Sequence, residues 1–318
     1  MTSKSATALY NSLTNYDAAS PELEKINGVI ELDSTVKPID GANTLWKHNI
    51  LGAPVWNAKT SSYCGVFDIR DILSAVIMTT RYIHCEDKTS QYNTVFEDKV
   101  GKYTITYLAS RNPIHSGPAS IPLKEICETF VKNNCRQLAI CKTKGVHCDH
   151  MISRSALVRF MSIHTPMEEL SEKLSDSGLN YLKSVVSVKD STTAFETFEL
   201  MDSKRLYGVA VVDQDDGSLV GYTSAKDVWL AAMDNSKTSM ELDVMSYLAA
   251  VRQLRIEKDG KTRHPACRVK EDDTISHILH VLVKTRYHRV FVVDKEQKPI
   301  GVVSITDIIN FTLEKSEK

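Results

Sequence analysis

One stretch near the end of the chain combines hydroxyl and carboxylate side chains at a spacing that suits a ligand with both hydroxyl and phosphate groups. Ser304, Thr306 and Asp307 follow a short apolar run, and His288 and Arg289 open the apolar run before it. A carboxylate just inside a helix start can accept hydrogen bonds from both ribose hydroxyls, each worth about 1.5–3 kcal/mol. Hydroxyls and N–H groups at the same helix start can receive a phosphate. We therefore predict a nucleotide site, with His288 and Arg289 as phosphate donors.

The same order of apolar run, polar turn, second apolar run and four-residue helix start occurs four times. The four helix starts, here named tetrads, are residues 68–71, 153–156, 224–227 and 304–307. From the end of the first apolar run to the end of the tetrad there are 14 residues in three copies and 13 in the last. The third tetrad keeps Ser224 and Asp227, whereas the second has Ala156 where the aspartate is expected. The sequence therefore predicts four repeats, with Ser224 and Asp227 in a second candidate nucleotide site.

The first tetrad keeps its final aspartate, Asp71, but changes its first residue. Asp68 stands where a hydroxyl is expected, and its carboxylate should repel a phosphate unless a cation pairs with it. Arg70 is the cation within the tetrad. We expect Arg70 either to pair with Asp68 or to bind the phosphate itself.

Each repeat is preceded by a segment with the apolar periodicity of an amphipathic helix. Ile275, Ile278, Leu279 and Leu282 show it most clearly. The first of these helices, around 36–47, contains Pro38 and should be irregular at its start. One unit therefore reads strand–helix–strand–strand–helix, an α/β unit too small to be stable alone.

Pairing of consecutive units would let their sheets share a core, and the polar segment 164–179 would join the two pairs. We accordingly predict an N-terminal extension at 1–22, a first module at 23–165 and a second module at 166–318.

These units resemble CBS domains, and the two pairs resemble Bateman modules. The likeness extends to the gamma regulatory subunit of the AMP-activated, or sucrose-non-fermenting, protein kinase family. It is carried by residues 53–56 with 65–71, by 178–188, and by 288–294 with 301–307. It implies an α/β disc of four CBS repeats in two Bateman modules. It also implies a non-catalytic subunit that binds AMP, ADP or ATP, senses energy charge, and assembles with a kinase catalytic (alpha) subunit and a scaffold (beta) subunit.

Several positions depart from the pattern of that family. In the family, the pair that matches His288 and Arg289 contacts phosphates near the centre of the disc. The second repeat has Arg136-Gln137 instead of this pair, and Leu51 replaces a phosphate-binding arginine of the first repeat. Arg252 lies near the position of a further phosphate-binding arginine. The resemblance thus implies fewer occupied sites than the family maximum, with the fourth repeat the most complete.

Composition and motifs exclude several other classes of protein. The net charge of −1 gives no general affinity for nucleic acid. The seven cysteines are odd in number and form no CxxC, which indicates a reducing compartment, and no stretch is long enough to cross a membrane. We expect a cytoplasmic or nuclear protein. No nucleophile elbow, P-loop, HExxH or dinucleotide fingerprint is present, so no enzyme is expected.

Four other interpretations have to be considered. The tetrad serines and aspartates can act simply as helix caps. A cluster at Cys141, His147, Cys148 and His150 has zinc-like spacing but lies within a strand–turn–strand, so no metal is expected. The chain can also be a CBS scaffold with degenerate sites, or a protein that binds S-adenosylmethionine or another adenosyl ligand, although phosphate donors disfavour the latter.

Overall fold

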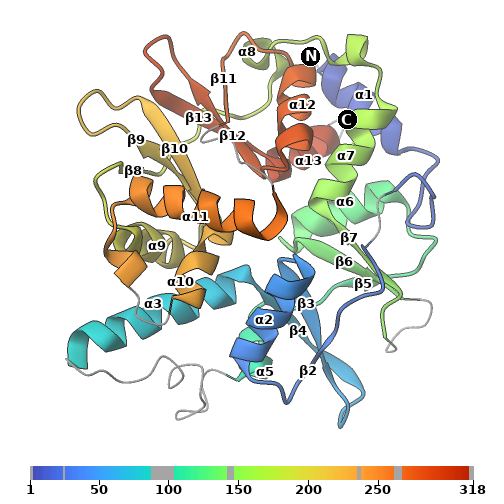
Figure 1. Cartoon of the computed structure of the whole chain (residues 1–318). Helices are drawn as coiled ribbons and strands as arrows, with labels where there is room; N and C mark the ends of the chain where they lie inside the picture. The colour runs from blue at the N-terminus through green and yellow to red at the C-terminus, as the bar shows by residue number, and fades with distance from the viewer. Residues whose placement is uncertain are drawn as a thin grey trace. The chain divides into compact units, whose positions relative to one another are not determined.

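The structure is a computed structural model that describes residues 3–23, 26–86, 104–141, 147–234, 238–260 and 267–314. The chain forms two compact units, each assembled from separate stretches of sequence. Unit 1 contains 1–29, 114–185 and 267–318, and unit 2 contains 30–113 and 186–266. In Figure 1, unit 2 combines the blue-to-cyan and the yellow-to-orange segments. Within the described residues, no helix has the length and apolar character needed to cross a bilayer.

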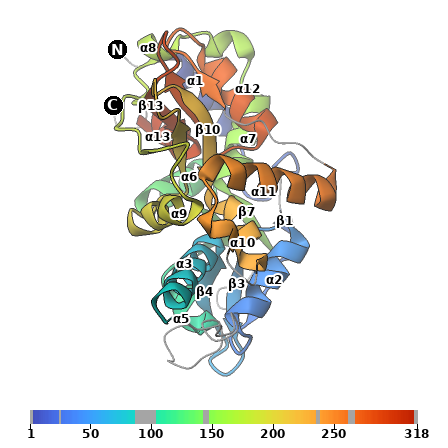
Figure 2. The same cartoon turned by 60° about the vertical axis from the view of Figure 1, so that its left-hand side comes forward.

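Unit 1 contains the second and fourth repeats. Its strands are β1 (Ile26–Asn27), β5 (Ser116–Gly117), β6 (Gln137–Ile140), β7 (His150–Ser153), β11 (Arg268–Val269), β12 (Arg289–Val293) and β13 (Pro299–Ser304). Its helices are α1 (Lys4–Leu13), α6 (Leu123–Lys132), α7 (Arg154–His164), η1 (Met167–Leu170), α8 (Leu174–Ser177), α12 (Ile275–Thr285) and α13 (Ile305–Leu313). The strands form the sheets β1-β7-β6-β5 and β11-β12-β13. Helix α7 lies beside α12 and α13 in both cartoon views (Figures 1 and 2).

Unit 2 contains the first and third repeats. Its strands are β2 (Leu32–Asp33), β3 (Gly52–Asn57), β4 (Ser62–Asp68), β8 (Ser187–Lys189), β9 (Gly208–Val212) and β10 (Leu219–Ser224). Its helices are α2 (Pro38–His48), α3 (Ile69–Glu86), α5 (Ile105–Ser110), α9 (Ala194–Ser203), η2 (Ala225–Val228), α10 (Trp229–Met233), η3 (Thr238–Glu241) and α11 (Val244–Asp259). The strands form the sheets β2-β3-β4 and β10-β9-β8.

All four repeats share one pattern of strands. In each, a short strand pairs in parallel with the first strand of an antiparallel hairpin, and a helix connects the two. The hairpin then leads directly into the tetrad, as in β12–β13 and α13. The predicted α/β class and the strand–helix–strand–strand–helix order are therefore confirmed.

The compact units do not follow the predicted division between residues 165 and 166. Helices α3 and α9, from the first and third repeats, pack together, and the Ser74 hydroxyl donates to the Asp202 carboxylate at 2.6 Å. Phe198 and Ile72 belong to one apolar core. Helix packing thus joins alternate repeats into compact units. The pairing of consecutive repeats into Bateman modules stays a prediction.

The N-terminal extension is an integral part of unit 1. Helix α1 buries Leu9 and Leu13. The Glu172 carboxylate accepts hydrogen bonds from the backbone N–H groups of Lys4 and Ser5 at 3.0 and 2.7 Å. A carboxylate at a helix N-terminus is stabilised by the partial positive charge there.

Candidate functional site

The fourth tetrad holds its aspartate in a capping box at the start of α13. The backbone N–H and the hydroxyl of Ser304 both donate to Asp307 Oδ2 at 2.8 Å, and the backbone N–H of Asp307 donates back to Ser304 Oγ at 3.3 Å. The helix-cap role is therefore confirmed for both residues. The capping box uses the Oδ2 atom of Asp307 and leaves Oδ1 for a different partner.

Asp307 Oδ1 forms an ion pair with the Lys183 ammonium. Lys183 lies in the segment that leads into the third repeat, and this segment runs beside β13. The Val302 N–H donates to the Tyr181 carbonyl at 3.0 Å. A Cβ on Gly301 would lie 2.5 Å from the same carbonyl oxygen, so glycine is required for the approach.

The second repeat contributes two arginines to the surroundings of the fourth tetrad. Arg154 Nη1 donates to the Thr306 hydroxyl at 2.7 Å. Arg136 Nη2 lies 3.1 Å from His288 Nδ1, and Ser155 Oγ lies 3.4 Å from His288 Nε2. A guanidinium can only donate, so His288 Nδ1 is the acceptor if this contact is a hydrogen bond. Two predicted phosphate-binding residues are thus beside two arginines.

The remaining predicted phosphate donor, Arg289, is the first residue of β12. It pairs in register with Ser304 of β13. The structure therefore places Arg289 next to the tetrad, half-buried at the start of the central strand of the sheet.

The third tetrad repeats the capping box with a different cation. The backbone N–H and hydroxyl of Ser224 donate to Asp227 Oδ2 at 2.7 and 3.0 Å. Arg255 Nη2, from α11, lies 3.4 Å from Asp227 Oδ1. Arg255, three positions beyond the predicted Arg252, is therefore the α11 side chain that reaches this carboxylate.

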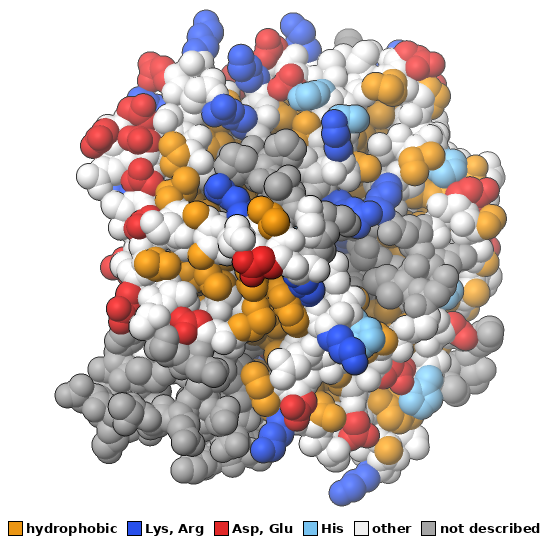
Figure 3. Space-filling model, in the orientation of Figure 1, with side chains coloured by type: hydrophobic (Ala, Val, Ile, Leu, Met, Phe, Trp, Pro, Cys, Tyr) orange, Lys and Arg blue, Asp and Glu red, His pale blue; other side chains and the backbone are white. Residues whose placement is uncertain are grey.

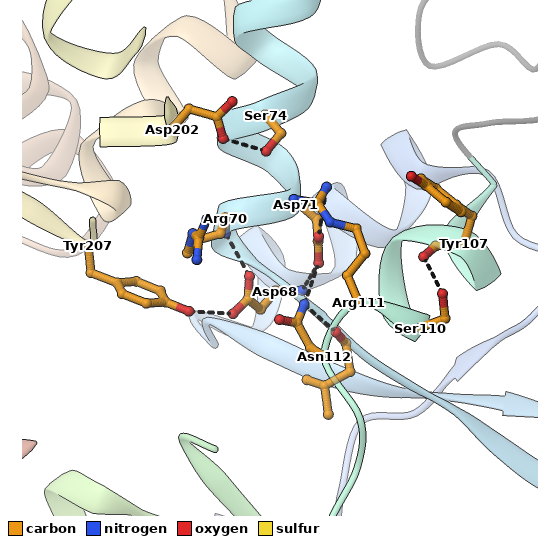
Figure 4. Close-up of polar contacts among 11 residues, drawn as sticks. Asp68, Arg70, Asp71, Ser74, Tyr107, Ser110, Arg111, Asn112, Asp202 and Tyr207 are labelled. Carbon is orange, nitrogen blue, oxygen red and sulfur yellow. Dashed lines mark hydrogen bonds and ion pairs between the residues drawn. The ribbon is translucent and has the colours of Figure 1, made fainter. Parts of the chain in front are cut away.

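In the first tetrad, the carboxylate of Asp68 lies at the start of the helix (Figure 4). Asp68 Oδ1 accepts the backbone N–H of Arg70 at 2.8 Å, and Asp68 Oδ2 accepts the Tyr207 hydroxyl at 3.3 Å. The Arg70 guanidinium carbon lies 5.2 Å from the centre of the Tyr207 ring. The Asp68 carboxylate thus accepts a hydrogen bond from a helix-start N–H group that a phosphate would otherwise use. The Arg70 guanidinium instead lies over an aromatic ring.

Asp71 is closed in by its neighbours. Its Oδ2 accepts the Asp68 N–H at 2.9 Å and the Asn112 side-chain amide at 3.2 Å, and its Oδ1 lies 3.7 Å from Arg111 Nη1. Burial, followed by the charge of Asp68, raises the pKa of Asp71 to about 8. The first tetrad therefore binds a proton near neutral pH.

One geometry is common to the three tetrads that end in aspartate. Oδ2 accepts the backbone N–H of the first tetrad residue, and Oδ1 faces a cation from outside the tetrad. These cations are Arg111, Lys183 and Arg255. They were not predicted, because they occupy no recurring spacing in the sequence.

Two further features are the charge distribution on one face of the molecule and the cysteine–histidine cluster. The face in Figure 3 intersperses basic side chains with acidic, apolar and uncharged ones. Cys141 and Cys148 are buried. Within the residues that the structure describes, no three His, Cys, Asp or Glu side chains are grouped so as to hold a metal ion.

Residues 179–228 and 262–314 match the family model of the CBS domain. The AMP-activated protein kinase gamma subunit of Dictyostelium discoideum is 21% identical over 90% of this chain and 49% of its own length. The gamma subunit of Saccharomyces cerevisiae is 21% identical over 95% of this chain and 91% of its own length. Protein SDS23 of Kluyveromyces lactis is 22% identical, covering 91% of this chain and 61% of that protein. The chain spans about half the length of several curated relatives that it matches.

Solved structures share the fold. Protein MJ1225 of Methanocaldococcus jannaschii, described as a candidate archaeal homologue of gamma-AMPK, superposes with a TM-score of 0.68. It is 15% identical, and the match covers 91% of this chain and 98% of that one. A conserved protein of Pyrococcus horikoshii superposes with a TM-score of 0.54 at 12% identity over 92% of this chain and 97% of its own. Two segments of the chain therefore match the CBS-domain family, and most of the chain is similar in sequence to gamma subunits of AMP-activated protein kinase.

Proposed function

We propose that this chain is a non-catalytic regulatory subunit that binds AMP, ADP or ATP and signals energy charge to a protein kinase. The observation that carries the proposal is the fourth tetrad. Its aspartate is fixed by a capping box, and Thr306 and His288 lie beside it within reach of arginines. Such a site offers a carboxylate to a ribose and cationic donors to phosphates.

Exposure of the tetrad aspartates favours the fourth repeat as the working site. The Asp307 side chain is 12% exposed, whereas those of Asp71 and Asp227 are each 1% exposed. A ligand can reach Asp307 without disruption of the buried network around the other two. We therefore propose the fourth repeat as the principal site, with Asp227, Ser224, Asp71, Arg70 and Arg252 as secondary candidates.

The proposed partners follow from the relatives named as kinase gamma subunits. Binding of a nucleotide would shift the chain between two conformations that a partner distinguishes. We propose a kinase catalytic (alpha) subunit and a scaffold (beta) subunit as those partners, in the cytoplasm or nucleus. No nucleic acid or membrane is proposed as a partner.

Calorimetric titration with AMP, ADP and ATP tests the proposal, after any co-purified nucleotide has been removed. We expect micromolar binding that Asp307→Ala weakens at least tenfold, about 1.4 kcal/mol. Absence of heat with all three nucleotides, on folded ligand-free protein, would contradict the proposal.

A second candidate function is that of a scaffold subunit with degenerate sites. The closed first tetrad, with Asp68 as its internal anion, and Ala156 in the second tetrad favour it. Affinity purification separates the two candidates. A kinase in the purified complex supports the sensor, and an unrelated assembly supports the scaffold.

A further inference from the structure

The ion pair at Asp307 differs from the other two in its access to solvent. Lys183 and Arg111 are similarly exposed, at 38% and 35%, but Asp307 is the most exposed of the three tetrad aspartates, at 12%. In the first and third repeats, the corresponding aspartates are buried. The pair at the fourth tetrad is therefore the one that a ligand can open.

The backbone next to Lys183 is hydrogen-bonded to β13, whereas the Lys183 side chain is partly exposed. The Tyr181 carbonyl accepts N–H groups from Val302 and Lys183 at 3.0 and 2.7 Å. The Tyr181 hydroxyl donates to Glu271 at 2.7 Å. The four-carbon stem of a lysine allows its ammonium to move while the backbone stays fixed.

A ligand that takes Asp307 must displace the Lys183 ammonium from the carboxylate. An uncharged ribose can replace the ammonium on Asp307, but it leaves the ammonium without a counter-charge. The exchange replaces the charged partner of Asp307 with neutral hydroxyls and leaves the 38%-exposed ammonium solvated by water alone. A ligand that also carries a phosphate offers the displaced ammonium a new anion.

We propose that Lys183 makes the fourth-repeat site select phosphorylated nucleosides over unphosphorylated ones, an inference that rests on the proposed nucleotide binding. Lys183 competes with the ribose hydroxyls for Asp307, and a phosphate compensates for the exchange. Discrimination against adenosine is thus produced by a residue outside the tetrad.

The test compares the dissociation constants of AMP and adenosine for wild type and for Lys183→Met, which keeps the length of the side chain and removes its charge. Adenosine should bind more tightly to the variant and AMP more weakly. We expect the ratio of the adenosine dissociation constant to the AMP dissociation constant to fall at least tenfold. Lys183→Arg, which keeps the charge, should largely preserve the ratio.

Lys298→Met is the matched control. Lys298 lies in the same repeat and forms an exposed pair with Glu296 at 2.8 Å. This variant should leave the ratio of dissociation constants unchanged.

The outcomes distinguish this inference from the proposed function. If wild type binds AMP and Lys183→Met leaves the ratio unchanged, or weakens both ligands equally, the selectivity role of Lys183 is wrong and nucleotide binding stands. If wild type binds neither adenosine nor any of AMP, ADP and ATP, both proposals are wrong.

Discussion

Asp71 and Asp307 occupy the same position in their tetrads but differ in the residue three positions before. Asp68 places a second carboxylate beside Asp71, whereas Ser304 gives Asp307 a hydroxyl donor. Burial and the neighbouring charge favour the protonated form of Asp71. Burial first, and the Asp68 charge second, therefore distinguish the carboxyl of Asp71 from the more exposed carboxyl of Asp307.

Asp71→Asn should change how stability depends on pH. The folded-state pKa of Asp71, about 8, lies above the ordinary value of 3.8. The protonated carboxyl therefore stabilises the fold fully below pH 3.8, and this stabilisation is lost as the pH rises towards 8. Within that window, the free energy of unfolding of Asp71→Asn should rise relative to wild type by about 1.4 kcal/mol per pH unit. Urea unfolding at pH 5, 6, 7 and 8 measures it. Parallel curves for the two proteins would show that Asp71 has an ordinary pKa.

Arg154→Gln should weaken AMP binding about tenfold, or about 1.4 kcal/mol. Arg154 contacts Thr306 at 2.7 Å and would supply a charged donor to a phosphate there. Adenosine affinity should stay within about twofold, because adenosine has no phosphate. Arg159→Gln, on a different face of α7, is the control. Equal losses for AMP and adenosine would instead indicate a structural role.

The candidate site could be predicted only in part from the sequence. The aspartate and the hydroxyl residues of the fourth tetrad were found because a helix start imposes a fixed spacing on its cap. Lys183, Arg111 and Arg255 reach the tetrads through tertiary packing. Because tertiary packing leaves no periodic pattern in the sequence, these three cations could be identified only from the structure.

At the scale of the elements, apolar periodicity was a good guide to the helices. Ile275, Ile278, Leu279 and Leu282 are all buried, as their spacing predicts. The expectation that the helix of the first repeat begins irregularly is wrong. Pro38 is the first residue of α2, where its missing N–H costs nothing and its fixed φ suits the helix.

Gly301→Ala should destabilise the protein by about 1–3 kcal/mol. The new Cβ would meet the Tyr181 carbonyl, a backbone group fixed by Val302. Gly221→Ala, at the equivalent place in the third repeat, should cost less, because its nearest neighbour at 3.1 Å is the flexible Met245 sulfur. Thermal unfolding of both variants measures the difference. Equal losses would contradict this account of β13.

For the whole molecule, the repeats were predictable and their grouping into compact units was not. The sequence shows which residues of a helix are buried, but not which other helix covers them. The contacts of α3 with α9 place the first repeat in one unit with the third. Chain order alone favoured consecutive repeats.

Phe198→Ala should loosen the first and third repeats together. Phe198 is buried in the core that both repeats share, and its loss should cost about 3–5 kcal/mol. Hydrogen exchange should accelerate in β3 and β9 and much less in β12. Phe130→Ala, in α6 of unit 1, should give the opposite pattern. Accelerated exchange confined to the third repeat would show that the shared core is not one cooperative unit.

The discontinuous make-up of the units bears on how the chain can be divided into fragments. The chain crosses between units after residues 29, 113, 185 and 266. No contiguous stretch of the gene therefore encodes either unit. The order of the repeats suggests a cut between residues 165 and 166. Such a cut leaves part of each unit on both fragments, so each unit has to assemble from two separate polypeptides.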